Sequence, residues 1–184
     1  IKKGQEVFHL RGLMLYGSFW GDGAERGPDF TADALHRTGV AMRSFYEQQA
    51  GGNLAQYDKD AIDVRVIREI KTNTCNDAQI HAFNELKAHY TRMFNDPEYE
   101  EAFKPSGAIS APEDIEALTA FFFWGGWVSG AERPGQTYSY THNWPYDPST
   151  GNLPTNQTMV WSFISIFGLF LGILVILYVY GQFK

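Results

Sequence analysis

The residues of this chain whose types suit chemistry are five histidines, one cysteine and scattered carboxylates. His81 and His89 are eight residues apart, more than two helical turns, so they cannot share a metal ion at the usual helical spacing. His36 follows Asp33 by about one helical turn, which favours a local hydrogen-bonded pair. We expect the histidines to be structural, and no serine, cysteine or carboxylate set forms a catalytic pattern. Cys75 is the only cysteine, which excludes an internal disulfide and a cysteine-based metal site.

A glycine-rich segment, residues 17–29, is the second candidate. Its closely spaced glycines allow positive φ angles and close backbone approach. The carboxylates of Asp22, Glu25 and Asp29 are oxygen ligands of the kind that hard cations prefer. From the residues alone, a surface turn before a helix is the favoured interpretation.

The elements that position these groups are predicted to be helices. The first follows residues 28–31, with Thr31 as its N-cap, and stops at Gly51–Gly52. The second begins at residues 76–79 with capping-box spacing and ends at residues 95–97.

A third helix is predicted to begin at residues 110–113, again with capping-box spacing and with proline in the first turn. Ile115, Leu118 and Phe122 form its inner face. The charged stretch from Asp58 to Lys71 is also expected to be helical. These patterns predict a mainly α domain.

One apolar segment predicts a membrane-spanning helix. Residues 159–180 contain no charged side chain and would extend about 33 Å as a helix, enough to cross a hydrocarbon core of about 30 Å. Trp161 lies near one end, and Tyr178 and Tyr180 lie near the other, as in an aromatic belt. Lys184 follows the segment and favours a cytoplasmic end there, with the acidic domain on the outer side.

The connection before this segment, residues 131–156, holds four prolines and no helical period. We expect an ordered loop that contacts the membrane surface or a partner, because aromatic side chains are costly to leave in water. Its candidate interface residues are Tyr138, Tyr140, Trp144 and Tyr146.

Composition narrows the class further. The net charge is −6 and aromatic residues make up 16% of the chain. Without a cluster of basic residues, a nucleic-acid partner is not supported. The aromatic excess suits wide interfaces or a membrane boundary.

Two sets of motifs stand at the two ends of the chain. The first set is Ile1–Phe8, Gly12–Met14, Gly17–Ala24 and Gly27–His36; the second is Ala120–Trp124, Arg133–Gly135, Tyr138–Pro148 and Gly151–Asn152. With these motifs in this order, nearly the whole chain resembles the hydrophilic domain of quinol-dependent nitric oxide reductases.

The resemblance implies a cytochrome c-like fold that has lost its haem. A c-type haem needs two thioethers and an axial histidine, in the pattern C-x-x-C-H. The matching stretch here, Leu13–Gly17, contains neither thiol nor histidine. We therefore expect a haem-free cytochrome c-like domain (residues 1–130), an interface loop (131–157) and a transmembrane helix (158–183), with apolar and aromatic side chains in place of the haem.

The resemblance also implies a noncatalytic part of an enzyme that reduces nitric oxide to nitrous oxide with electrons from quinol. Haem b and non-haem iron would lie in a catalytic bundle of transmembrane helices, either in the same polypeptide or in a separate subunit. This chain would cap that bundle on the outer, periplasmic side of a bacterial-type cytoplasmic membrane, in contact with lipid. In the cytochrome c-fed relatives a loop after the haem motif helps to bind calcium, and the resemblance places Gly23 and Glu25 at the matching positions, where Glu25 replaces an aromatic residue.

Two other functions fit the same pattern. The chain can be the equivalent part of a nitric oxide dismutase, which only catalytic residues elsewhere would distinguish. It can also be a membrane-tethered binding module without a redox role, which would survive detergent extraction without a haem-bearing partner.

Overall fold

The computed structural model describes residues 1–184 except 22–26, 73, 100–108, 143, 149–154 and 184. The described residues form no β-strand, only two isolated bridges, Ser18 with Asp29 and Glu132 with Ser139. The mainly α prediction is therefore confirmed. The helices are α1 (Lys2–Leu10), a 3₁₀ turn η1 (Leu13–Leu15), α2 (Phe30–Gln49), α3 (Gln56–Ile70), α4 (Asp77–Asn95), α5 (Pro112–Gly130) and α6 (Asn156–Gln182).

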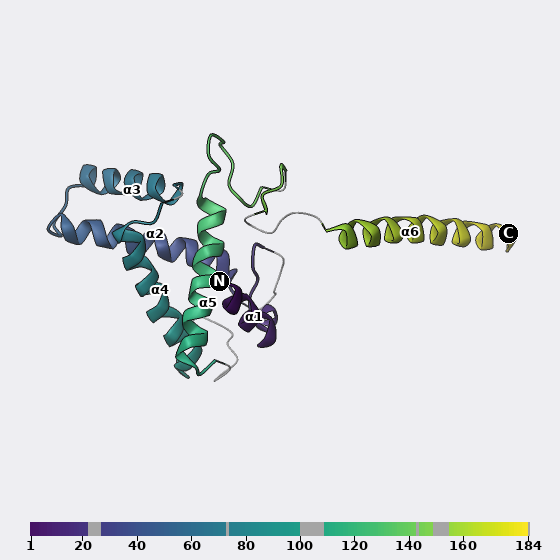
Figure 1. The fold of residues 1–184 in the computed structure, drawn as a ribbon, viewed down its shortest axis with the longest axis horizontal. Coiled ribbons are helices and arrows are strands. Elements are labelled where there is room, and N and C mark those ends of the chain that lie inside the picture. Colours follow the sequence, from purple (N-terminus) through teal and green to yellow (C-terminus); the bar gives the residue numbers. More distant parts are fainter. Residues whose placement is uncertain (22–26, 73, 100–108, 143, 149–154, 184) are drawn as a thin grey trace. The chain divides into compact units, whose positions relative to one another are not determined.

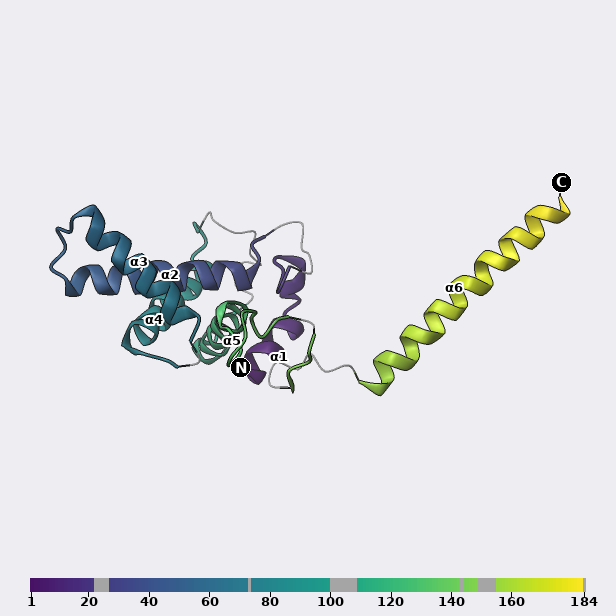
Figure 2. The same cartoon turned by 90° about the horizontal axis from the view of Figure 1, so that it is seen from above.

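The chain divides into two compact units, Ile1–His142 and Asn143–Lys184. In the first unit, α5 contacts α1, α2 and α4, whereas α3 packs on α2. Figures 1 and 2 show α4 and α5 side by side, with α5 crossing one end of α2, α4 meeting α2 along its middle, and α1 against α5. Helix α1 was not among the helices that the sequence predicted, because it is short and contains Gly4.

Helix α2 begins two residues earlier than predicted. Asp29, not Thr31, is its N-cap, and the Asp29 carboxylate accepts a hydrogen bond from the Ala32 N–H at 2.9 Å. Thr31 lies inside the first turn and its hydroxyl accepts the backbone N–H of Trp20 at 3.1 Å. The predicted end is confirmed: Gly51 and Gly52 take φ angles of 93° and 82°, which favour glycine.

Helix α4 has the predicted capping box. Asn76 accepts the Gln79 N–H at 3.0 Å, and the Gln79 side chain accepts the Asn76 N–H at 2.9 Å. Helix α5 does not: its N-cap is Ala111, which supplies no side-chain hydrogen bond, and Pro112 takes the first helical position. The capping box predicted from Ser110 is therefore wrong.

The core of the first unit is dominated by stacked aromatic rings. Phe30 lies parallel to Phe122, with ring centroids 4.5 Å apart, and Phe19 lies parallel to Phe121 at 4.4 Å. Phe8, which is 1% exposed, contacts all four rings. A second cluster, built from Met42, Tyr46, Val66, Ala78 and Ala82, joins α2, α3 and α4.

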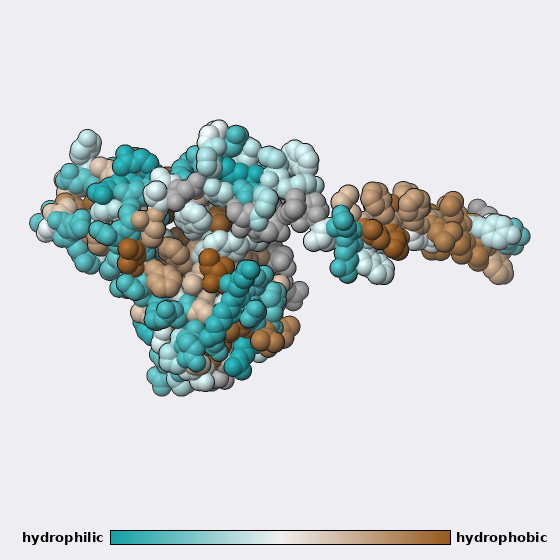
Figure 3. Space-filling view, in the orientation of Figure 1, coloured by the Kyte–Doolittle hydropathy of each residue, from teal (hydrophilic) through white to brown (hydrophobic). Residues whose placement is uncertain are grey.

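The predicted apolar segment forms a continuous helix, α6, with Thr155 as N-cap. This helix is long and apolar enough to cross a membrane: its most apolar stretch has a mean hydropathy of 2.6, and none of that stretch is buried against other parts of the chain. Figure 3 shows the hydrophobic surface that results along this helix. Such a surface is stable only in contact with lipid or with other apolar helices.

Candidate functional site

Three regions carry the candidate residues: the glycine-rich segment, the core next to residues 13–17, and the aromatic loop. In the first region, the predicted calcium residues Gly23 and Glu25 lie outside the described residues, as does Asp22. The third carboxylate, Asp29, is described. It accepts hydrogen bonds from the Ser18 hydroxyl at 2.7 Å and the Gly21 N–H at 2.6 Å.

Through these hydrogen bonds, Asp29 links Ser18 and Gly21 to the first turn of α2. Burial by itself would raise the pKa of Asp29, but hydrogen bonds from the Ala32 N–H, Ser18 and Gly21 hold that pKa below its ordinary value. Within the described residues, no group of three or more histidine, cysteine, aspartate or glutamate side chains can hold a metal ion.

Residues 13–17, which the resemblance pairs with a haem-anchoring stretch, run directly into the aromatic core. Gly12 adopts a left-handed conformation with φ of 62°, and Leu13 is fully buried. At Gly17, an added Cβ would lie 2.4 Å from the Phe30 ring, so no larger residue fits without moving that ring. Packed apolar and aromatic side chains thus surround Leu13.

A partly buried polar group joins α2 to α4. The Asp33 carboxylate accepts Arg37 Nε at 2.8 Å and the Tyr90 hydroxyl at 3.0 Å, and His89 Nε2 lies 3.6 Å from it. The predicted pairing of Asp33 with His36 is therefore wrong, because His36 is exposed at the surface. Sequence reasoning missed Tyr90 and His89 because they lie on a helix more than fifty residues away, and it missed Arg37 although that residue is one helical turn from Asp33.

The charges within this group are well defined. Burial by itself would raise the pKa of Asp33, but contacts from His89 and Arg37 hold it below its ordinary value. Burial, followed by the neighbouring Asp33 carboxylate, raises the pKa of Tyr90 well above its ordinary value. Tyr90 therefore stays a hydroxyl donor, and the group is a structural link between helices.

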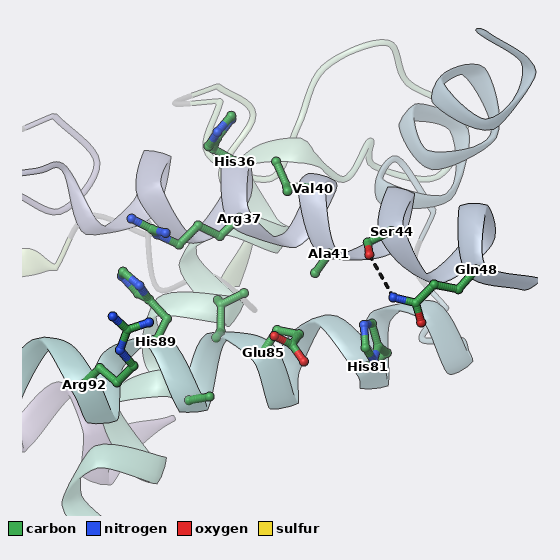
Figure 4. Close-up of a pocket in the computed structure, with 12 residues that line it drawn as sticks. His36, Arg37, Val40, Ala41, Ser44, Gln48, His81, Glu85, His89 and Arg92 are labelled. Atoms are coloured by element: carbon green, nitrogen blue, oxygen red, sulfur yellow. Dashed lines mark hydrogen bonds between the residues drawn. The ribbon is translucent and has the colours of Figure 1, made fainter. Parts of the chain in front are cut away.

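A polar groove of about 490 Å³ lies beside this link, between α2 and α4. Figure 4 shows Arg37 and Gln48 on α2 and, across from them, His81, Glu85, His89 and Arg92 on α4, whereas the His36 side chain projects from the side of α2 away from α4. Gln48 donates a hydrogen bond to the Ser44 hydroxyl at 3.2 Å. The histidines are spread along the groove and do not converge on one point, which does not suit metal binding or acid–base catalysis.

The first part of the predicted interface loop folds against the first unit. Arg133 is 7% exposed, and its guanidinium donates hydrogen bonds to the carbonyl oxygens of Tyr140 at 3.1 Å and His142 at 2.7 Å. The Tyr140 ring stacks on Trp127 at 6.1 Å, and the Tyr138 ring lies 5.3 Å from the Arg133 guanidinium. Tyr138 and Tyr140 are thus half-buried within their own unit.

The second part of the loop belongs to the other unit. Trp144 and Tyr146 are 66% and 42% exposed, and their rings meet edge to face at 4.8 Å. Two of the four predicted interface residues, Tyr138 and Tyr140, thus belong to the first unit, and the other two belong to the second. The sequence did not predict that Arg133 holds the loop through its hydrogen bonds to the carbonyl oxygens of Tyr140 and His142. The Pro-Gly pair that follows Arg133 indicates a turn but does not indicate these partners.

These observations define a class: a helical domain with an aromatic core, followed by one helix of membrane-spanning length. The family model for the NorB cytochrome c-like domain of nitric oxide reductase matches residues 1–146. The chain belongs to this family, as its motifs indicated. No curated protein matches it.

Proposed function

We propose that the chain is the noncatalytic extramembrane part, with one membrane helix, of a quinol-dependent nitric oxide reductase. The assembly would convert two molecules of nitric oxide, two electrons and two protons into nitrous oxide and water. The reaction would take place in a separate haem-bearing helix bundle, which this chain caps. Membership of the NorB cytochrome c-like family supports a place in a nitric oxide reductase-type assembly, and the catalytic residues of the bundle would separate a reductase from a dismutase.

One observation carries the noncatalytic role. Residues 13–17 stand where a cytochrome c would attach its haem, yet they supply neither cysteine nor histidine. Leu13 is instead fully buried among aromatic side chains, and Cys75, the only cysteine, is exposed just before α4. These residues do not fit a c-type haem, so electrons would reach the bundle from quinol without passing through this domain.

The proposed role of the domain is to cover the outer end of the bundle and exclude water from it. Trp144 and Tyr146 suit such an interface, because exposed aromatic residues dominate the energetics of protein contacts. Haem b and non-haem iron would belong to the partner, and quinol would bind within the assembly. Gly23 and Glu25 stay predicted calcium ligands, and we place the domain on the periplasmic side of a bacterial-type membrane.

The decisive experiment is purification of the chain with and without the catalytic bundle. We expect the 184-residue chain in detergent to show no c-type haem absorbance and no nitric oxide turnover. The chain should co-purify with a haem-bearing bundle when both are produced together. A covalently bound haem, or a chain that never retains the bundle, would refute the proposal; the second outcome would favour a tethered binding module.

A further inference from the structure

An apolar slot of about 400 Å³ lies between α4 and α5, on the face that carries the first residue of the chain. It is lined chiefly by Ile1, Cys75, Phe83, Phe123, Trp124 and Trp127. No charged side chain lines it among the described residues. Figure 3 shows hydrophobic surface at this place beside α5, surrounded by hydrophilic residues.

The slot continues into a wider surface of tryptophan rings, which we call the Trp face (Trp20, Trp124, Trp127 and Tyr140). Trp20 is 43% exposed and its ring lies 5.6 Å from Trp124, and Trp127 stacks on Tyr140. Tyr140 lies sixteen residues before Asn156, where α6 begins, so only a short stretch of chain separates the Trp face from the membrane-length helix.

Two of the three indole N–H groups of this face donate hydrogen bonds within the protein. Trp127 Nε1 donates a hydrogen bond to the Thr72 carbonyl oxygen at 3.1 Å, and Trp20 Nε1 to the Gly125 carbonyl oxygen at 3.4 Å. A buried N–H without a partner costs free energy, so rings whose donors are paired can enter an apolar medium more cheaply.

We propose that the Trp face and its slot lie in the interfacial region of the lipid bilayer, with the slot filled by acyl chain. Residues 143–155 separate the first unit from α6 and reach at most about 45 Å when extended. The tether therefore keeps the face close to any membrane that α6 enters, at a high effective concentration.

The negative charge of the chain favours apolar contact with lipid over electrostatic binding to anionic headgroups. A net charge of −6 gives no attraction to anionic headgroups, so binding must come from apolar and aromatic burial. Tryptophan is the side chain most enriched at the membrane interface, and an uncharged slot matches the acyl boundary. This inference does not depend on the catalytic partner.

Cys75 allows a direct test, because it is the only cysteine, is exposed and lines the slot. A nitroxide attached to Cys75 would be measured in the full chain in phosphatidylcholine nanodiscs, with oxygen and a water-soluble nickel chelate as relaxation agents. Two single-cysteine chains in a Cys75→Ser background provide references. Trp161→Cys reports a site in the membrane helix, and Tyr57→Cys, at an 82% exposed position on α3, reports a site in water.

We expect the label at Cys75 to be severalfold less accessible to nickel than the label at position 57, and to approach position 161 in its oxygen accessibility. Trp124→Glu, checked for an unchanged near-ultraviolet spectrum of the core, should restore nickel access at Cys75. Equal nickel access at positions 75 and 57 would overturn the proposal. Protection that appears only when the haem-bearing bundle co-purifies would also overturn it, because the occupant would then be protein.

Discussion

The crossing of α1 over α5 provides a test of the fold in which one substitution has opposite effects at two positions. At Gly4, an added Cβ would lie 2.0 Å from the Ala117 carbonyl oxygen, and that oxygen is part of the α5 backbone. At Gly39 in α2, the nearest atom would be Ile70 Cδ1 at 3.9 Å, an ordinary contact. Gly4→Ala must therefore move two helices apart, whereas Gly39→Ala needs no movement.

The magnitudes follow from these distances. Overpacking costs about 1–3 kcal/mol, and a backbone neighbour that cannot rotate away places Gly4→Ala at the upper end. The higher helix propensity of alanine offsets about 1 kcal/mol, which leaves a net loss of about 2 kcal/mol. Gly39→Ala has the same propensity gain without a clash, so it should stabilise the domain by about 0.5–1 kcal/mol.

The assay is thermal unfolding of the full chain in mild detergent, followed by near-ultraviolet circular dichroism of the aromatic core. For a unit of this size, we expect Gly4→Ala to lower the midpoint by roughly 6–10 °C and Gly39→Ala to raise it by a few degrees. If Gly4→Ala raised the midpoint as Gly39→Ala does, α1 and α5 would not approach as described.

Three further predictions concern single interactions. The pKa of Asp33 is lowered on folding, so the stability that this carboxylate contributes is present above about pH 4 and is lost as the pH falls below that value. In thermal unfolding at a series of pH values, Asp33→Asn should therefore reduce the fall of the midpoint temperature at acid pH. An unchanged fall would contradict the assignment. Asn76→Ala removes the α4 capping box and should cost about 1 kcal/mol in urea unfolding, whereas the exposed change Asn84→Ala should cost little. If Trp144 is an interface anchor, Trp144→Ala should weaken assembly with the catalytic bundle by about 2 kcal/mol. Assembly would be measured by titrated co-purification, with Tyr57→Ala, at an exposed position on α3, as the control variant. Full assembly and activity of Trp144→Ala would show that Trp144 contacts lipid instead.

Local signals determined much of the secondary structure. The capping box at Asn76 and the glycine stop after α2 involve atoms within a few residues, so the sequence alone predicts them. The α2 start was misplaced because Asp29 and Thr31 are both good capping residues, and only the contacts of Asp29 with Ser18 and Gly21 decide between them. At α5, Ser110 has the right spacing for a capping box, but the helix begins one residue later, with Ala111 as its cap.

By itself, the sequence determined that the chain has a helix of membrane-spanning length and that no c-type haem can attach at residues 13–17. Both follow from composition and covalent chemistry, which do not depend on folding. Only the tertiary structure decided that Asp33 contacts His89 and Tyr90 rather than His36, that Trp20 meets Trp124, and that Trp127 stacks on Tyr140. Those contacts join residues far apart in the chain, and packing around the Phe8 core sets which of them meet.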